Sequence, residues 1–313
     1  MQLFIETLLS GLALGLVYSV IALGYTMVYG VLELINFAHS EIFMFGGIVG
    51  VELLLGFLTK TTWHPLLQLV FALIVGAAAS GILAISVERV AYRPLRLRGA
   101  PRLVPLISAI GMSLFLQDIV RLVESLFGNF NRPFPSYVKN DQQDFFALTH
   151  PLISGATVSN TTLTILVVGA LMLAGLTYFV NYTKTGRAIR AVAQDQGTSS
   201  LMGINVNNII TVTFLIGGAL GGVAGVLYAL KFGTLNPYSG FLPGLKAFTA
   251  AVLGGIGSIP GAMLGGVVLG LLEQLAAQYI SSSYKDIIAF GLLILILIFR
   301  PSGLLGRKVS EKV

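Results

Sequence analysis

A short polar run near the start of the chain lies between two long apolar stretches. The run VLELINFAHSEIFMFGG carries Glu33, Asn36, His39 and Glu41. Polar groups at membrane depth cost several kcal/mol unless they are paired or face water, so residues of this kind mark solute and ion pathways. The simpler alternatives are that Glu33 to Asn36 lies in the membrane interface and that His39 is a hydrogen-bonded core residue. We predict that Asn36, His39 and Glu41 line a translocation path.

The second polar feature is the segment from Tyr182 to Asn208, which carries basic charge in the middle of the chain. Asp195 can cap a short helix that runs through Ser199 to Met202, and Gly203 is suited to the left-handed residue that ends it. Such a helix has about two turns and a length of roughly 10 Å. It is typical of a cytoplasmic docking element, and a solvated connecting loop is the alternative. The predicted coupling residues are Arg187, Arg190, Asp195, Gly203, Ile204 and Asn205.

Motifs for several kinds of chemistry are missing from the sequence. It contains no GxxxxGK[ST] phosphate loop, no GxSxG elbow and no HExxH pair, and its three histidines are far apart in the sequence. It has no cysteine, which excludes a thiol nucleophile and an iron–sulfur site. We therefore predict neither an enzyme nor a metal or cofactor site. An ion-coupled secondary transporter of small hydrophobic solutes is the alternative function, with Glu41, Glu52 or Glu273 as a proton relay.

The composition is that of an integral membrane protein. Hydrophobic residues make up 55% of the 313 residues and charged residues 10%, whereas soluble domains have about 25% charged residues. A span needs about 20 apolar residues, so the chain has room for about eight to ten transmembrane helices in a single permease domain. The long apolar runs lack period-two alternation, which favours a helical bundle over a β-barrel. The basic residues gather at span ends, so they indicate membrane topology and not nucleic-acid binding.

Basic residues also orient the bundle, because loops rich in Lys and Arg stay in the cytoplasm. The segment between the third and fourth spans, predicted to be a loop, holds Arg93, Arg96, Arg98 and Arg102. We predict about nine spans, an external amino terminus and a cytoplasmic carboxyl terminus. The other basic residues assigned to the cytoplasm are Lys184, Arg187, Arg190, Arg300, Arg307, Lys308 and Lys312, against Lys60, Arg132, Lys139, Lys231, Lys246 and Lys285 outside. In the fourth span, Arg121 has Asp118 and Glu124 at i,i+3 spacing, which predicts local ion pairs.

The last third of the chain is interrupted by glycine and proline. The run GGALGGVAG in the sixth span has overlapping GxxxG pairs, which predict close helix packing. The apolar piece Leu245–Leu253 lies between two breaks and is too short to span, as expected of a half-helix or re-entrant segment. Tyr29-Gly30 before Asn36, and Phe232-Gly233 before Asn236, are weakly similar, which indicates a possible inverted repeat. We add Asn236, Pro237 and Lys246 to the predicted path.

These stretches together resemble one transporter family. The segments ALGYTMVYGVLELINFAHSEIFMFGG, VERVAYRPLR, ISAIGMSLFLQ, GRAIRAVAQD with LMGIN, and KAFTAAVLGGIGSIPGAMLGG are similar to those of branched-chain amino acid permeases of the LIV-H type, which belong to ATP-binding-cassette importers. The sequence differs from the general importer motif EAA-x3-G, since Gly197, Thr198 and Ser199 stand at the Glu-Ala-Ala positions of that motif. The outer segment from Gly128 to Thr162 has no match to the family.

The resemblance implies how the protein works and with what partners. It implies a multi-pass subunit of the bacterial inner membrane that carries leucine, isoleucine or valine into the cytoplasm. Its implied partners are a second homologous permease, two cytoplasmic ATP-binding subunits, a periplasmic amino-acid-binding protein and the lipid bilayer, with no nucleic acid. ATP hydrolysis then belongs to the partner subunits.

Overall fold

The computed structural model describes residues 1–101, 103–126, 130–136, 144–152, 155–300 and 302–306. Within these residues, eight helical segments are long and apolar enough to cross a membrane, which confirms the predicted all-α membrane bundle. The long helices are α1 (Gln2–Leu32), α2 (His39–Gly56), α3 (Pro65–Val87), α5 (Leu103–Leu126), α6 (Asn160–Tyr182), α9 (Val206–Phe232), α11 (Ile259–Tyr279) and α12 (Lys285–Phe299).

Shorter elements connect the long helices. Among the described residues, four are α-helices, three are single turns of 3-10 or π-helix, and the strands form two small antiparallel pairs, β1 with β4 and β2 with β3. They are η1 (Leu58–Lys60), η2 (Glu88–Tyr92), α4 (Arg93–Leu97), α7 (Lys184–Gln194), α8 (Gln196–Leu201), α10 (Phe241–Gly254), η4 (Ser282–Tyr284), β1 (Arg132–Pro133), β2 (Thr149–Pro151), β3 (Thr157–Ser159) and β4 (Thr234–Leu235).

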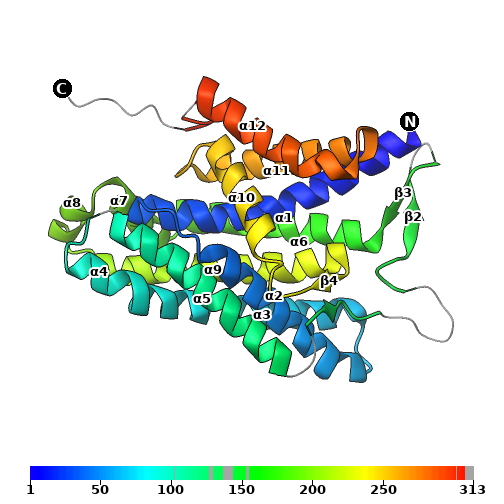
Figure 1. Cartoon of the computed structure of the whole chain (residues 1–313), viewed down its shortest axis with the longest axis horizontal. Coiled ribbons are helices and arrows are strands. Elements are labelled where there is room, and N and C mark those ends of the chain that lie inside the picture. Colours follow the sequence, from blue (N-terminus) through cyan, green and yellow to red (C-terminus); the bar gives the residue numbers. More distant parts are fainter. Residues whose placement is uncertain (102, 127–129, 137–143, 153–154, 301, 307–313) are drawn as a thin grey trace.

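The two ends of the bundle differ in character (Figure 1). One end, on the left of the view, holds α4, α7 and α8, and we call it the basic end because Arg93, Arg98, Arg187 and Arg190 lie there. The opposite end holds the amino terminus with β2 and β3, and we call it the hairpin end. Basic residues concentrate on the cytoplasmic side of membrane proteins, so this arrangement agrees with the predicted topology.

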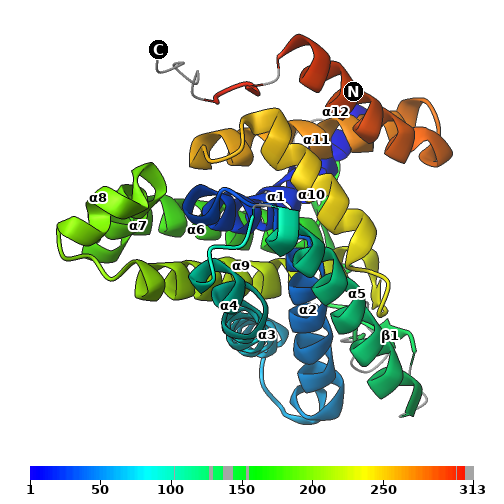
Figure 2. The same ribbon diagram turned by 60° about the vertical axis from the view of Figure 1, so that its left-hand side comes forward.

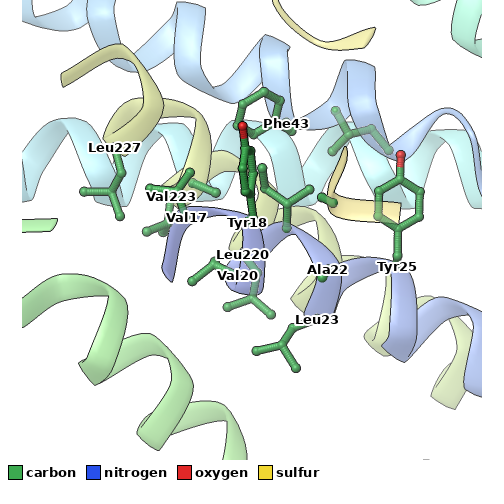
Figure 3. Close-up of a cluster of buried hydrophobic side chains, with 14 of the residues drawn as sticks. Val17, Tyr18, Val20, Ala22, Leu23, Tyr25, Phe43, Leu220, Val223 and Leu227 are labelled. Carbon is green, nitrogen blue, oxygen red and sulfur yellow. The ribbon is translucent and has the colours of Figure 1, made fainter. Parts of the chain in front are cut away.

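Helices α1 and α9 form the centre of the bundle. Most of their residues are buried, whereas α5, α6 and α12 expose long apolar faces. Figure 3 shows Val17, Tyr18 and Leu23 of α1 in one cluster with Phe43 of α2 and Leu220 of α9. These side chains are buried by neighbouring helices and not by lipid, which explains why α1 is apolar on all its faces.

The predicted glycine-rich face of α9 packs closely on α3. A Cβ atom added at Gly222 would collide with the carbonyl oxygen of Gly76 in α3. Helices α1 and α11 approach in the same way, since a Cβ atom at Gly15 would lie 2.7 Å from the Cα atom of Val267. Small residues permit such close backbone contact, so the predicted role of the GxxxG pairs is confirmed.

The packing has the pairwise correspondence that an inverted repeat requires. Helix α1 packs on α11 as α9 packs on α3, and the shorter helices α2 and α10 follow α1 and α9 respectively. Both long helices end at a left-handed residue, Glu33 with φ 54° after α1 and Gly233 with φ 75° after α9. Figure 2 shows α2 running downward and α10 running upward from the middle of the molecule. Matching interruptions of this kind occur in transporter folds.

The structure tests two details of the predicted topology. It has eight long apolar segments within the described residues, inside the predicted range of about eight to ten, and the predicted half-helix is α10. At 14 residues α10 is about 21 Å long, below the roughly 30 Å of the hydrocarbon core. The segment with Arg93 and Arg96 is not a loop, because α3 continues through the π-turn η2 into α4. Arg102 lies outside the described residues.

At the hairpin end, Arg132 in β1 connects α2 with α5 through ion pairs. Its guanidinium pairs with Glu52 of α2 and with Glu124 of α5, at 2.8 Å from the Glu124 carboxylate. The predicted local pair of Asp118 and Arg121 is present at 3.2 Å, but Glu124 pairs with Arg132 and not with Arg121. The sequence could not indicate this, because β1 reaches α5 only after the chain has turned back.

Candidate translocation site and coupling platform

Helix α2 begins in the middle of the bundle and not at its edge. Its first residue, His39, lies against Gly24 of α1 and Gly221 of α9, where added Cβ atoms would contact the ring. Gly24 lies eight residues before the end of α1, which corresponds to about 12 Å along the helix. The chain from Glu33 to Ala38 therefore enters the bundle from the basic end and starts α2 at membrane depth.

Helix α10 begins at the same place from the opposite side. A Cβ atom at Gly240, the residue before α10, would lie 2.8 Å from Oε2 of Glu41, and one at Gly244 would collide with Ser40. Neither α2 nor α10 has a side-chain cap at its amino terminus. The amino-terminal ends of two short helices, each carrying a partial positive charge, therefore meet inside the bundle.

A cavity of about 260 Å³ lies beside this meeting point. It is mostly apolar and has a few polar groups, the usual character of a small-molecule site. Glu41 is its acidic member, and Oε1 of Glu41 accepts hydrogen bonds from Ser40 at 3.3 Å and from Ser113 at 3.4 Å. The lining residues are Tyr25, Phe37, Ser40, Glu41, Ile110, Ser113, Leu114, Gln117, Phe241, Leu245 and Phe248.

Of the three path residues predicted near the start of the chain, Glu41 lines the cavity. Asn36 is buried and precedes the lining residue Phe37, and its Oδ1 accepts a 2.6 Å hydrogen bond from the Tyr92 hydroxyl. His39 is also buried and stacks edge-on against Tyr25, with 4.7 Å between ring centroids. Asn36 and His39 therefore support the wall of the cavity, and a direct contact with a solute remains a prediction for both.

The second group of predicted path residues lies outside the cavity. Asn236 accepts a 2.9 Å hydrogen bond from the Tyr238 backbone N–H in the turn before α10, and Pro237 is buried in the same turn. Lys246 is on the face of α10 away from the cavity, where its Nζ lies 2.7 Å from Glu273 and 2.6 Å from Asp286. Their roles in a path are still predictions.

Sequence reasoning missed the contribution of α5 to the cavity. Ser113 and Gln117 are four residues apart on this helix, and both line the cavity with Ile110 and Leu114. Residues at i and i+4 share a helix face, so two polar side chains at this spacing in an apolar span were an available signal. The aromatic side of the cavity, Phe248 in particular, carried no distinctive sequence pattern.

The predicted docking helix is present as α8. Asp195 caps it by accepting hydrogen bonds from the N–H and the hydroxyl of Thr198, both at 2.9 Å. Gly203 follows with φ 82°, a conformation that favours glycine. The helix spans Gln196–Leu201, so it ends one residue before the predicted end at Met202. The side chain of Gln196 donates a 2.6 Å hydrogen bond to the carbonyl oxygen of Val31 at the end of α1.

A second amphipathic helix, α7, precedes α8 and was not predicted. Thr183 caps it, and Ile189 and Val192 are buried on one face. Arg187 and Arg190 are exposed on the opposite face. We call α7 and α8 together the coupling platform. The apolar and basic residues of α7 alternate at helical spacing, which was an available signal in the sequence. The helix has only 11 residues, so the pattern was too short to be recognised.

The tip of the coupling platform is apolar and exposed. Leu201 is 88% exposed and Met202 is 79% exposed, next to Gly203 at the basic end. Ile204 is half-buried, and Asn205 caps α9 by accepting from the Asn208 N–H at 3.1 Å. Exposed apolar residues outside the long spans are typical of a protein contact, and sequence reasoning named Ile204 but not this pair.

A buried charge network joins the basic end to the long helices. Glu88 in η2 pairs with Arg96 of α4 at 3.3 Å and accepts from the Thr211 hydroxyl of α9 at 3.1 Å. Arg96 also donates to Asn207, the second residue of α9, at 2.7 Å. A π-turn often occurs at a functional position. Here it brings Glu88 toward α9 and Tyr92 toward Asn36. Helix α9 therefore contacts both this charge network and the coupling platform.

The chain matches known proteins over nearly its whole length. Residues 7–297 match the family described as branched-chain amino acid transport system / permease component. The chain is 46% identical to the high-affinity branched-chain amino acid transport system permease protein BraD of Pseudomonas aeruginosa, with 99% of this chain and 98% of BraD covered.

Two further relatives give the same result. The high-affinity branched-chain amino acid transport system permease protein LivH of Escherichia coli K12 is 45% identical, with 99% of this chain and 98% of LivH covered. A probable LivH permease protein of Methanocaldococcus jannaschii is 28% identical over 91% of this chain and 87% of its own length. With eight apolar spans in the part of the chain that the structure describes, this multi-pass membrane protein belongs to the family of branched-chain amino acid transport permease components.

Proposed function

We propose that the protein is one permease subunit of an ATP-binding-cassette importer that carries branched-chain amino acids into the cytoplasm. The observation that carries this proposal is the coupling platform, a capped helix pair with an exposed apolar tip at the basic end of the bundle. The names of BraD and LivH support the substrate class. The sequence has no phosphate loop, so the proposal assigns ATP hydrolysis to two cytoplasmic partner subunits and no catalytic role to this chain.

The exposed mouth of the cavity supports a second permease subunit as partner. Ile110, Leu114 and Phe241 line the cavity and are 46%, 58% and 54% exposed. A second, homologous permease packed on α5 and α10 would close this mouth and complete a path between the two subunits. The hairpin end would then face the periplasm of a bacterial inner membrane and receive the amino acid from a binding protein.

The platform predicts a specific result when its apolar tip is charged. In the complete complex, Leu201→Asp should lower co-purification of the ATP-binding subunits by at least about tenfold, because burying an unpaired carboxylate in an interface costs several kcal/mol. Ser200→Asp is the matched control, since Ser200 is exposed on the preceding position and is not part of the tip. Co-expression of all subunits followed by affinity purification measures the ratio.

The same preparations separate docking from folding. The second permease should co-purify equally with both variants, because the tip is far from the mouth of the cavity. Equal recovery of the ATP-binding subunits with Leu201→Asp and with the wild type would contradict the assignment of α8 as the docking element. Docking would then have to involve α4 or the chain after α12.

A further inference from the structure

We propose that Glu41 binds the ammonium group of the transported amino acid, and that the start of α10 faces its carboxylate. The cavity between α2, α5 and α10 is then a solute-binding site within the permease itself. This inference rests on the proposed function and adds to it a residue that selects amino acids over other apolar solutes.

The first argument is the state of the Glu41 carboxylate. Glu41 is fully buried, and among the described residues its carboxylate has no salt-bridge partner. Oε1 accepts two long hydrogen bonds from serine hydroxyls, and Oε2 has no hydrogen-bond partner in the described part of the chain. An unpaired buried carboxylate is costly and is retained where it has a functional partner. A cationic group on a solute in the cavity would supply that partner.

The other glutamates at membrane depth differ from Glu41. Glu88 pairs with Arg96, Glu124 with Arg132, and Glu273 with Lys246, each at 3.3 Å or less. The bundle thus gives its buried glutamates cationic partners, and Glu41 stands out at the wall of the one mid-membrane cavity described above. Ion pairing accounts for the other glutamates, whereas Glu41 has, among the described residues, only the partial positive charge of the α2 and α10 amino termini beside it.

The second argument is the geometry of the two helix starts. The amino-terminal end of α10 packs directly on the Glu41 carboxylate. A Cβ atom added at Gly240, the residue before α10, would lie only 2.8 Å from Oε2 of Glu41. Helix α10 has 14 residues and no side-chain cap, so its amino terminus can attract an anion. An anion-attracting helix end beside a carboxylate matches the two charges of a zwitterion. A purely cationic solute would use only one of them, and an uncharged solute would use neither.

The third argument is the remaining wall of the cavity. Tyr25, Phe37, Leu245 and Phe248 present aromatic and aliphatic surface beside Glu41. The volume of about 260 Å³ is below the roughly 300–1,000 Å³ typical of drug-sized sites, so it suits a small solute. An amino acid with an apolar side chain fits both the surface and the charges.

A cysteine-protection experiment tests the site without any change at Glu41. The chain has no cysteine and the half-buried Gln117 lines the cavity, so a reporter at Gln117→Cys can be labelled in the complete complex in lipid nanodiscs, without the binding protein. Millimolar leucine should slow labelling of this chain, and 4-methylpentanoate, which is leucine without its amino group, should slow it at least about tenfold less. Equal protection by the two compounds, or none by leucine, would overturn the proposal.

A matched pair of glutamine variants tests the residue. Glu41→Gln removes the charge and keeps the shape, and Glu52→Gln makes the same change on the same helix but outside the cavity. A hydrogen bond to a charged group is typically worth roughly ten- to a hundred-fold in affinity. Glu41→Gln should weaken protection by leucine and slow leucine uptake by this factor, and Glu52→Gln should leave the protection at the wild-type value.

Loss of the second permease from the Glu41→Gln complex would mean that Glu41 pairs with a cation of that subunit, which also overturns the proposal. Wild-type protection in Glu41→Gln would do the same. In each case ATP-driven leucine uptake by the unmodified complex would leave the proposed function intact. The absence of such uptake would instead refute the proposed function, so the two failures are distinguishable.

Discussion

Replacing Lys246 with methionine should destabilise the bundle strongly. The Lys246 ammonium lies 2.7 Å from Glu273 and 2.6 Å from Asp286, and it fastens α10 to α11 and α12. The Lys246 and Glu273 side chains are only 7% and 3% exposed. Lys246→Met removes the cation and leaves Glu273 with the Tyr18 hydroxyl at 2.9 Å as its remaining contact among the described residues.

The magnitude follows mainly from Glu273. Removing one partner of a buried ion pair typically costs about 3–5 kcal/mol, because the other charge stays buried. Asp286 is 40% exposed, and exposed pairs contribute only about 0–1 kcal/mol, so it adds little. The double variant Lys246→Met/Glu273→Gln removes both charges and keeps an acceptor for Tyr18. We expect it to recover at least about 2 kcal/mol of the loss.

Unfolding of the purified chain in mixed detergent micelles measures these free energies. Lys60→Met is the control, because Lys60 is an exposed lysine in η1 and surface changes usually stay within about 0.5 kcal/mol. The reasoning would be refuted if Lys246→Met were no less stable than Lys60→Met. It would also be refuted if the double variant were no more stable than Lys246→Met.

Three further predictions concern coupling, packing and topology. Gly203→Val places a side chain at φ 82°. It should reduce stimulated ATP hydrolysis and uptake together, while affinity purification recovers the assembled complex normally. The control is Gly111→Val, at a position where an added Cβ atom meets no atom within 4 Å, and it should retain both activities. Gly222→Val should lower the unfolding free energy of the bundle by about 1–3 kcal/mol or more because it separates α9 from α3, and Gly111→Val should not. Arg98→Cys should react with an impermeant thiol reagent in inverted vesicles and Lys60→Cys in intact cells; the reverse pattern would invert the topology.

The sequence was sufficient for features that depend on neighbouring residues. The apolar spans follow from composition, the cap of α8 from Asp195, and its end from Gly203, all through local rules. The glycine face around Gly222 was also visible because GxxxG spacing is regular. Each of these features is set within a few residues of the chain.

Features that depend on distant contacts were beyond the sequence. Lys246 was assigned to a path and counted as external, but its partner Glu273 is 27 residues away and on another helix. Glu124 was paired with Arg121 because the more distant Arg132 could not be placed. The cavity itself needs four helices. Glu41 could be suspected from its surroundings and Ser113 from its spacing to Gln117, whereas Phe248 could not.

Uptake of leucine into liposomes that hold the complete complex tests the central claim most directly. Labelled leucine is supplied with the binding protein, and either ATP or a pH gradient is the energy source. The proposed function predicts uptake that needs both ATP and the binding protein and does not respond to the pH gradient. Uptake driven by the pH gradient without ATP would contradict it and would favour an ion-coupled transporter.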